Sequence, residues 1–567
     1  MVFFTSLHGG RWRRILILPA LFFSAANLLP AQTETNTGLP GPGEISVAAT
    51  NAPAANPPPA VPATTPPPAP APTPPAAPTL TAAAPLIPAI SPTSNVPGSI
   101  LGALMTLASI GGFLLYQCGL TRAKNCGHTS VLLLVGVLFG LTGYWIGGFA
   151  VQTGGIGDAH AALAQPFSTA EKGALDHELS PVLFGHPWGF MGSAGFFLAQ
   201  DASPAPDDSS RNGVASLFLI QAALLAIAVA AALGAALERG RLLAMAFCAC
   251  LIGVLVYPLP ANWVWGGGWL AEMGREFGLG HGFVDSGGAG VVHETAGTLA
   301  LVIAIVLGPR HGRFGRNKPS TSAIPGHNVP FIVLGSIVLL ISWMATNAFA
   351  CASLAPDAAS TGAGLAAINT LLAATGGLVI SFAQAAWQKR RPEPARLCRG
   401  LLGGAVASCG GAGLIDPWAA FVIGGVAGLL VQAAMDYVER KHIDDPVGAA
   451  AVHGAGGAWG VLAVGLFANG TAGAGLNGVT GPVRGLFFGG AWHQLAAQAI
   501  GCVTGFAVVC LLGYACVSLV QKILGLRVDL ADEATGLDWP ETGAFGYQGD
   551  AEVEGAADGG KASPEKS

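Results

Sequence analysis

Long apolar runs recur along the chain after residue 97, and most are long enough to cross a bilayer as a helix. A transmembrane helix needs about 20 predominantly apolar residues. Eleven runs approach or meet that length, near 98–117, 129–151, 214–237, 242–258, 286–308, 329–350, 362–388, 400–415, 417–437, 448–468 and 492–520. Asp, Glu, Lys and Arg together make up only 10% of the chain, whereas a soluble domain carries about 25%. The sequence therefore predicts an all-α polytopic membrane protein with eleven transmembrane helices.

Glycine and cysteine usage supports this class of protein. The 82 glycines lie mostly inside the apolar runs, which is typical of transmembrane helices that pack closely. The ten cysteines form no CxxC pair, so neither a disulfide framework nor a zinc site is predicted. A net charge of -5 gives no reason to expect a nucleic-acid partner.

The first 97 residues differ from the rest. Arg11, Arg13 and Arg14 precede a short apolar stretch that ends near Ala31, which predicts a signal peptide over 1–32. The competing interpretation is an uncleaved extra helix. Residues 33–97 are rich in Pro, Ala and Thr and predict a disordered linker. The transmembrane domain is expected over 98–527, and a cytoplasmic C-terminal tail over 528–567.

Lys and Arg are distributed unevenly between alternate connections of the predicted helices. If the N-terminus lies outside, the connections after helices 1, 3, 5, 7, 9 and 11 are cytoplasmic, and they carry 17 Lys and Arg, without counting Lys561 and Lys566 near the end of the tail. The outward connections carry four: Lys172, Arg211, Arg275 and Arg484. Cytoplasmic loops are enriched in Lys and Arg. The split therefore supports eleven helices, an outside N-terminus and a cytoplasmic C-terminus in the cell membrane.

Two of the apolar runs open with matching motifs. Asp285 is followed eight residues later by His293 (DSGGAGVVH), and Asp445 is followed eight residues later by His453 (DPVGAAAVH). By the predicted topology these helices enter from opposite faces, which indicates an inverted 5+5 repeat plus one extra helix. Inverted repeats place their shared site near the midplane. Eight residues at 1.5 Å each put each histidine about 12 Å below its own face of a core about 30 Å thick, so the imidazoles are expected to lie within a few ångströms of each other.

The paired histidines have two interpretations. A single membrane histidine is commonly a hydrogen-bonded core residue, but a symmetry-matched pair favours a transport path, because ionisable groups in a bilayer mark such paths. A neutral imidazole pair offers a donor and an acceptor and can pass a proton. A metal ion would need a further ligand, and no other His or Cys has the required placement. The sequence predicts neither a metal nor a cofactor.

Three tryptophans surround a glycine triplet ahead of the first histidine helix. Trp263, Trp265 and Trp269 flank Gly266 to Gly268, and tryptophans at a membrane edge are commonly interfacial anchors. That explanation covers at least two of them. Trp265, beside the triplet, suits a ring held over a pore mouth, where an indole face attracts a small cation by about 0.5–2 kcal/mol.

Over roughly residues 98–548 the chain resembles the ammonium transporters of the Amt/Mep/Rh superfamily. The matching motifs occur in order: GLTRAKN (119–125), GAALER (234–239), VWGGG (264–268), DSGGAGVVH (285–293), GHNVPF (326–331), NT (369–370), DDPVGAAAVHG (444–454) and GLRV (525–528). The resemblance implies a homotrimer in which each protomer has a narrow pore lined by His293 and His453. It implies that ammonium is captured and deprotonated, that ammonia crosses, and that the proton travels separately. Trp265 matches the cation-binding tryptophan, and Asp285 matches the aspartate that supports the vestibule.

The chain departs from this family at the outer end of the pore. By alignment on the motifs, the two phenylalanines that gate the family pore fall on Leu224 and Thr346, and the vestibule serine falls on Ala350. The capture site and the gate are therefore expected to differ from those of the family. This change motivates an alternative function, an ammonium sensor with the same fold and weak conduction.

Glu294, directly after the first histidine, is unexpected in a lipid environment. One interpretation is a protonated side chain that forms a hydrogen bond to another helix. The other is a proton-relay carboxylate beside the pore. A hydrolase built on the histidine pair and Glu294 is a third class of function, but no nucleophile constellation with a recognisable spacing accompanies them. The sequence therefore predicts a transporter and not an enzyme.

The segment after Arg527, VDLADEATGLDWPETGAFGYQ, resembles the family's cytoplasmic tail, which interacts with a PII-type regulatory protein. A histidine common in that tail is replaced by Thr542. The expected partners are thus ammonium or ammonia, the lipid bilayer, further copies of the chain, and a PII-type protein at the cytoplasmic face.

Overall fold

The computed structural model describes residues 96–155, 175, 178–183, 185–199, 208–314, 324–354 and 359–547. The chain divides into two units, and all of these residues belong to one of them. The expected signal peptide (1–32), almost all of the expected linker (33–97), Lys172 and the tail residues 548–567 lie outside the described residues. The description below concerns the helical unit alone.

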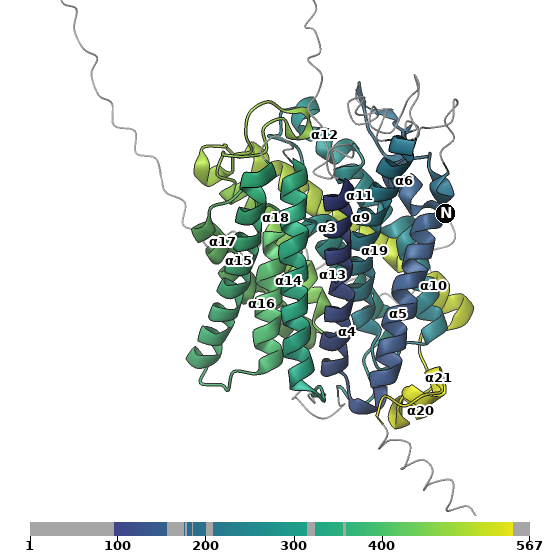
Figure 1. Ribbon diagram of the computed structural model, residues 1–567. Coiled ribbons are helices and arrows are strands. Elements are labelled where there is room, and N and C mark those ends of the chain that lie inside the picture. The colour runs from purple at the N-terminus through teal and green to yellow at the C-terminus, as the bar shows by residue number, and fades with distance from the viewer. Residues whose placement is uncertain are drawn as a thin grey trace, which may run out of the picture. The chain divides into compact units, whose positions relative to one another are not determined.

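Long helices run side by side through this unit (Figure 1). Ten described stretches are long and apolar enough to cross a membrane. Five of them are mainly single helices: α9 (Asp208–Leu233), α14 (Val329–Leu354), α15 (Ala359–Trp387), α17 (Pro417–Arg440) and α19 (His493–Leu524). The other five are segmented: α3 (Val96–Leu107) with α4 (Ser109–Leu120); α5 (Cys126–Gly143) with η3 (Tyr144–Gly148) and α6 (Phe149–Thr153); α10 (Leu242–Leu251) with η7 (Ile252–Val256), α11 (Pro258–Trp265) and α12 (Trp269–Phe277); η8 (Ala289–Glu294) with α13 (Thr295–Leu307); and η10 (Ala450–Ala455) with α18 (Gly456–Phe467).

The eighth predicted helix is shorter than the others. It corresponds to α16 (Pro394–Ser408), which has 15 residues and is about 22 Å long at 1.5 Å per residue. The predicted bounds 400–415 are wrong, because Pro394 begins the helix at a position where proline is favoured. Beyond Ser408 the chain turns through several glycines instead of continuing the helix. The all-α membrane fold is confirmed, while the count of eleven spanning helices stays a prediction.

Short elements cap the two ends of the helical unit. At the end that carries α12, two small antiparallel ladders form between β1 (Glu178–Leu179) and β4 (Met191–Gly192), and between β2 (Val182–Leu183) and β3 (His186–Pro187). We call this end the outer face. The 3-10 turns η5 (Phe196–Leu198), η11 (Leu476–Gly478) and η12 (Leu486–Phe488) belong to it, and η2 (Ala123–Asn125), η6 (Gly234–Ala236), α20 (Leu530–Thr535) and α21 (Asp538–Thr542) belong to the opposite, inner face. Figure 1 places α12 at the top, and α20 and α21 at the bottom.

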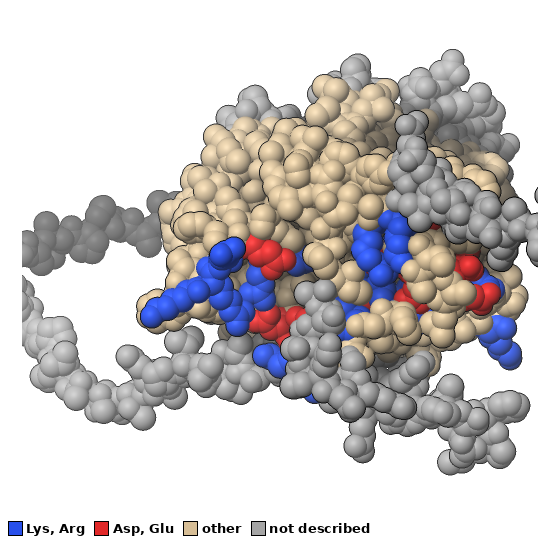
Figure 2. All heavy atoms as spheres, turned by 90° about the horizontal axis from the view of Figure 1, so that it is seen from below, with Lys and Arg blue, Asp and Glu red and all other residues tan. Residues whose placement is uncertain are grey.

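Charged side chains gather on the inner face. Figure 2 shows Lys and Arg together with Asp and Glu on the surface seen from below. The innermost ions are buried: Glu238 is bonded to Arg122 at 3.0 Å and to Arg310 at 2.8 Å, and Arg310 is also bonded to Asp444 at 2.8 Å. This network ties together the connections that follow α4, α9, α13 and α17. These connections lie at the same end of the molecule, as the alternation of Lys and Arg predicts.

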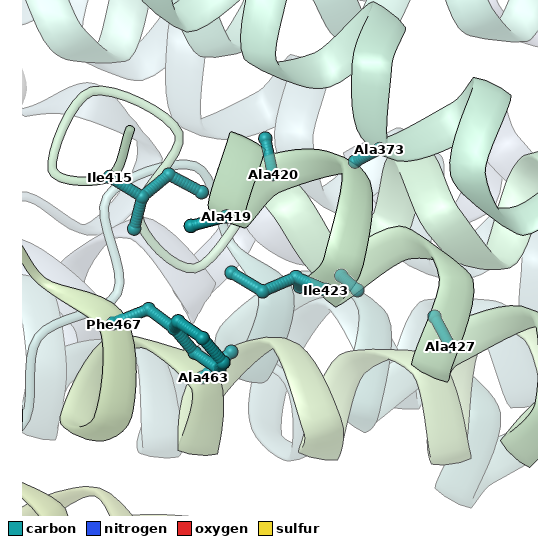
Figure 3. Packing of buried hydrophobic residues seen from close by; sticks show 9 residues of the cluster. Ala373, Ile415, Ala419, Ala420, Ile423, Ala427, Ala463 and Phe467 are labelled. Carbon is teal, nitrogen blue, oxygen red and sulfur yellow. The ribbon is translucent and has the colours of Figure 1, made fainter. Parts of the chain in front are cut away.

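Small residues allow the helices to approach closely. Between α15, α17 and α18 the core consists largely of alanine, with Ile423 and Phe467 filling the remaining space (Figure 3). A Cβ on Gly424 of α17 would overlap the carbonyl of Ala373 on α15. Close backbone contact of this kind is typical of membrane helices that lack large side chains at their interface, and it explains why glycine is concentrated in the apolar runs.

Candidate functional site

The two histidine helices begin with the same local structure. The Asp285 carboxylate accepts backbone N–H bonds from Gly288, Ala289, Gly290 and Val291 at 2.7–3.1 Å. The equivalent carboxylate of Asp445 accepts from Gly448 at 3.1 Å and from Ala450 at 2.8 Å. An acidic side chain satisfies the unpaired N–H groups at a helix start and complements the helix dipole. Asp285 therefore fixes the start of the first histidine helix.

A glycine with positive φ makes each of these caps. Gly288 has φ 91° and Gly448 has φ 80°, a conformation that other residues adopt only with strain. After each glycine the chain forms a π-helical segment, η8 and η10, and each segment contains the histidine. Segments of this type are frequent at functional sites. The first motif starts at the outer face, where the Ser286 hydroxyl is bonded to Gly410, and the second starts beside the inner ion network at Asp444. The two helices therefore run in opposite directions, as the repeat predicts.

The imidazoles of His293 and His453 meet where these helices cross. Their Nδ1 atoms are 3.0 Å apart, and the rings stack with centroids 5.1 Å apart and an angle of 21° between their planes. Both side chains are almost completely buried. The expected distance of a few ångströms is therefore observed, and a Nδ1–Nδ1 bond requires one ring to donate and the other to accept.

Glycines on both helices permit this crossing. A Cβ on Gly297, one turn after His293, would overlap the backbone nitrogen of Gly454, directly after His453. A Cβ on Gly457 would likewise overlap the carbonyl of Ala289. The two backbones are in direct contact, and this contact brings the short imidazole side chains within hydrogen-bond distance.

Two aromatic residues that the sequence reasoning missed contact the histidines. The Trp343 ring on α14 lies edge-on to His293 and His453, at centroid distances of 5.0 and 5.8 Å. The Phe113 ring on α4 lies 5.9 Å from that of His453. Trp343 is three residues before Thr346, so its helical spacing from the expected gate position could have suggested that it lies deeper on the same path.

A cavity lies between the histidine pair and the outer face. This outer cavity is lined by Trp265 and by the three altered gate and vestibule positions, Leu224, Thr346 and Ala350. Its other lining residues are Thr106, Ile220, Gln221, Ser286, Gly287 and Phe349. The Trp265 indole N–H donates to the Asp285 carbonyl at 2.8 Å, which holds the ring in place. Two lining residues were not predicted. Ser286 directly follows Asp285 in the sequence, and Phe349 lies three residues after Thr346.

A second cavity lies on the inner side of His453. This inner cavity is lined by Phe113, Tyr116, Gln117, Ala231, Leu402, Val447, Ala449, Val452 and His453. Apart from His453, the polar groups among these side chains are the Tyr116 hydroxyl and the Gln117 amide. The histidine pair is thus bordered by one cavity toward each face.

Glu294 points away from both cavities. Its Oε1 accepts a bond from the Cys502 thiol of α19 at 3.1 Å, and it lines a separate space with Val264, Phe283 and Gly501, among others. The helix-to-helix hydrogen bond expected in one interpretation of Glu294 is present. Its carboxyl and the imidazole of the preceding His293 face different neighbours.

The inner ion network has electrostatics of its own. Burial alone would raise the pKa of the Glu238 carboxyl, but the guanidinium groups of Arg310 and Arg122 lower it to about 2. Burial likewise opposes ionisation of Asp444, and Arg239 with Arg310 holds its pKa below the ordinary value. Both carboxylates are therefore charged, and each is buried with a partner of opposite charge.

Comparison with known proteins identifies the family. The chain matches the Ammonium Transporter Family over residues 99–547. It is 31% identical over 440 residues to the ammonium transporter Amt2 of Archaeoglobus fulgidus, and the match covers 77% of this chain and 84% of the relative. The chain belongs to the ammonium transporter family. Ammonium transporter 1 member 3 of Solanum lycopersicum is 30% identical over 463 residues, which cover 78% of this chain and 91% of that family member.

Solved structures of an Amt protein and of Mep2 share this fold. One described as "Sensor Amt Protein" is 27% identical with a TM-score of 0.64, and the match covers 80% of this chain and 98% of that chain. Mep2 of Saccharomyces cerevisiae is 24% identical with a TM-score of 0.61, covering 78% of this chain and 92% of that chain; at that identity the likeness concerns the fold alone. Family membership and the spanning helices together make the chain a multi-pass membrane protein.

Proposed function

We propose that this member of the ammonium transporter family conducts ammonia through a pore in each protomer that passes the His293–His453 pair. The observation that carries the proposal is the 3.0 Å contact between the two Nδ1 atoms, made by inverted helices and bordered by a cavity toward each face. The named transport activity of the relatives agrees with it. A narrow apolar passage favours the neutral molecule, because an ion would lose its hydration there.

The shared Nδ1 proton fixes what the pair offers to a substrate. The ring that donates through Nδ1–H has an unprotonated Nε2, and the ring that accepts has a protonated Nε2. A neutral pair therefore presents one acceptor and one donor at the same time. Ammonia, with three N–H groups and one lone pair, can bind to either ring without a change in net charge.

Capture of ammonium is assigned to the outer cavity. The anchored Trp265 ring supplies a π face that attracts a small cation. The Ser286 hydroxyl donates its proton to the Gly410 carbonyl at 3.1 Å, so its oxygen lone pairs remain available to accept from ammonium. Ser286 would in this way supply the hydroxyl that Ala350 lacks.

The barrier below this site differs from one made of two stacked rings. Thr346 and Thr106 place their hydroxyl oxygens 2.9 Å apart, and Leu224 and Phe349 line the same cavity. This arrangement combines one aromatic ring, one aliphatic side chain and a hydroxyl pair. We assign the gate to these four residues, and we expect it to be more polar than a phenylalanine pair.

The proton released from ammonium must move separately, and Glu294 is the candidate relay. The relay needs an ionisable carboxyl, whereas a structural role needs only the bond with Cys502. Transport by Glu294→Gln should then fall and change its pH profile, while Cys502→Ala, which keeps the carboxyl, should leave the profile unchanged. Unchanged activity and an unchanged profile in Glu294→Gln would leave only the hydrogen-bond role.

A sensor with weak conduction is the second candidate function. The altered outer cavity and the likeness to a structure described as a sensor support it. Growth of a transporter-deficient host on low ammonium separates the two. The transporter proposal predicts that the wild type restores growth and that His293→Ala with His453→Ala does not. Failure of the membrane-inserted wild type to restore growth would favour the sensor or another substrate.

The assembly and orientation of the chain are part of the proposal. We assign a homotrimer in the cell membrane with the outer face and the N-terminus outside and the tail in the cytoplasm. The concentration of Lys and Arg on the inner face supports this orientation. A PII-type regulatory protein would bind at the same face, where α20 and α21 lie.

A further inference from the structure

The inner cavity contains one polar side chain that is only half satisfied. Gln117 is almost completely buried, and its Nε2 donates to the Ala230 carbonyl at 2.7 Å. Because a carbonyl can only accept, this bond fixes which end of the amide carries the oxygen. The Oε1 atom is buried and has no hydrogen-bond partner among the described residues. A buried acceptor in this state requires an explanation.

The position of Gln117 relates this oxygen to the histidine pair. Gln117 and His453 line the same inner cavity. Phe113, whose ring lies 5.9 Å from that of His453, is four residues earlier on α4. Since α4 runs toward the inner face, Gln117 lies about 6 Å further along that direction. It therefore follows His453 on a path to the inner face.

Besides His453 and Gln117, the only side chain with a polar group among the described lining residues is Tyr116. Its hydroxyl donates to the Val447 carbonyl at 3.2 Å, and its phenol oxygen is a weaker acceptor than an amide carbonyl. The remaining side chains of this cavity, apart from His453, are apolar. A molecule with N–H groups that leaves His453 inward would thus meet one unused side-chain carbonyl, that of Gln117.

We propose that the Gln117 Oε1 accepts an N–H of ammonia as it leaves His453, which makes Gln117 a substrate-binding residue of the inner pore. This inference rests on the proposed transport function. Ammonia that accepts the Nε2–H of His453 through its lone pair has three N–H groups to donate, and Gln117 receives one of them. The amide is neutral, so it stabilises ammonia without retaining ammonium by charge.

Transport by purified protein in liposomes tests the assignment. Ammonium is added outside, and the rise in internal pH that follows ammonia entry is recorded. Gln117→Met keeps the length of the side chain and removes the acceptor. One lost neutral hydrogen bond corresponds to about a fivefold lower maximal rate. The half-saturating ammonium concentration should stay unchanged, because the outer cavity is intact.

The chain offers a matched control in Gln432. It is equally buried, its Nε2 donates to the Arg396 carbonyl at 3.0 Å, and its Oε1 is also unpaired among the described residues. It lines neither cavity beside the histidines. Gln432→Met should transport at the wild-type rate. An equal loss of rate in both variants would show a general packing effect and overturn the assignment.

A charged variant keeps the inference testable if Gln117→Met fails to fold. The carboxylate of Gln117→Glu should retain ammonium at the inner end and slow transport. The transport rate should recover as the pH falls and the carboxylate takes up a proton. Wild-type rates in Gln117→Met, or in Gln117→Glu at every pH, would contradict the role of Gln117. Inactive wild-type protein would instead refute the transport function, and the inference with it.

Discussion

The backbone contact between Gly297 and Gly454 controls how closely the histidine helices approach. A Cβ at Gly297 would overlap backbone atoms of Gly454, which cannot move aside as the end of a flexible side chain could. Gly297→Ala should therefore push α13 and α18 apart and lengthen the Nδ1–Nδ1 contact. We expect ammonium transport to be lost and the free energy of unfolding to fall by about 1–3 kcal/mol, as for overpacked cores.

Gly505 provides the matched control for this substitution. It lies within the spanning helix α19, and nothing is within 4 Å of the position that its Cβ would occupy. Gly505→Ala should keep wild-type transport and thermal stability, measured in liposomes and by unfolding in detergent. If Gly297→Ala transported like Gly505→Ala, the close crossing would not be needed for function.

Single residues show what the sequence could predict about the site. The repeat predicted the His293–His453 pair because two motifs with equal spacing fix depth from opposite faces. Trp343 and Gln117 were missed because their roles depend on which side of a helix faces the pore, and an almost uniformly apolar helix has no amphipathic pattern to reveal that. Their facing directions follow from helix packing alone.

The inner ion network joins the ends of four transmembrane helices. The Glu238 carboxylate bonds to Arg122 and Arg310 and is fully buried. Glu238→Gln removes this carboxylate from Arg122 and leaves Arg310 with Asp444 alone, and breaking a buried pair costs about 3–5 kcal/mol. The variant should unfold in detergent at a lower temperature at neutral pH. Glu393→Gln, an exposed substitution on the same face, should unfold like the wild type.

The pH dependence of this effect follows from the depressed pKa. Because Glu238 has a pKa of about 2 in the folded protein, below its ordinary value near 4.3, its contribution is present above that ordinary value. It is lost as the pH falls toward 2. The difference between wild type and Glu238→Gln should therefore be largest at neutral pH and shrink below about pH 4.3. A constant difference down to pH 2 would contradict the assigned ion pairs.

A buried carboxylate, that of Asp538, holds the tail helices against the inner face. The Asp538 carboxylate accepts backbone N–H bonds from His128 and Gly546, both at 2.8 Å. Asp538→Ala leaves these donors unpaired, at about 1–3 kcal/mol for each one that stays buried. The segment after α20 should then be cleaved faster by added protease, as detected by mass spectrometry. Asp532→Ala, at a partly exposed position, should be cleaved like the wild type.

The predicted and observed elements differ where apolar composition alone is ambiguous. The long runs correctly located ten spanning helices, but α16 begins six residues earlier than predicted because Pro394 starts it. The π-helical segments η8 and η10 could not be predicted from composition. They arise where an aspartate cap, a glycine with positive φ and a close helix crossing occur together.

At the scale of the whole molecule, two helices of opposite direction meet at the histidines, and the cavities on the two sides of the pair have different lining side chains. Trp265 and Ser286 suit capture of a cation from one side, whereas the neutral Gln117 suits release of ammonia on the other. The direction of insertion therefore decides which solution the capture site faces. The charge asymmetry predicts the orientation, because connections rich in Lys and Arg remain in the cytoplasm.

Reporter fusions test this orientation. A green fluorescent protein fused after Ser567 should fluoresce, since it folds in the cytoplasm, and alkaline phosphatase at the same position should be inactive. Fusions to a chain truncated after Gly481, in the outer connection between α18 and α19, should give the opposite pair of results. An active phosphatase and a dark fluorescent protein after Ser567 would reverse the orientation. The cavity with Trp265 would then face the cytoplasm, and ammonium would be captured from inside the cell.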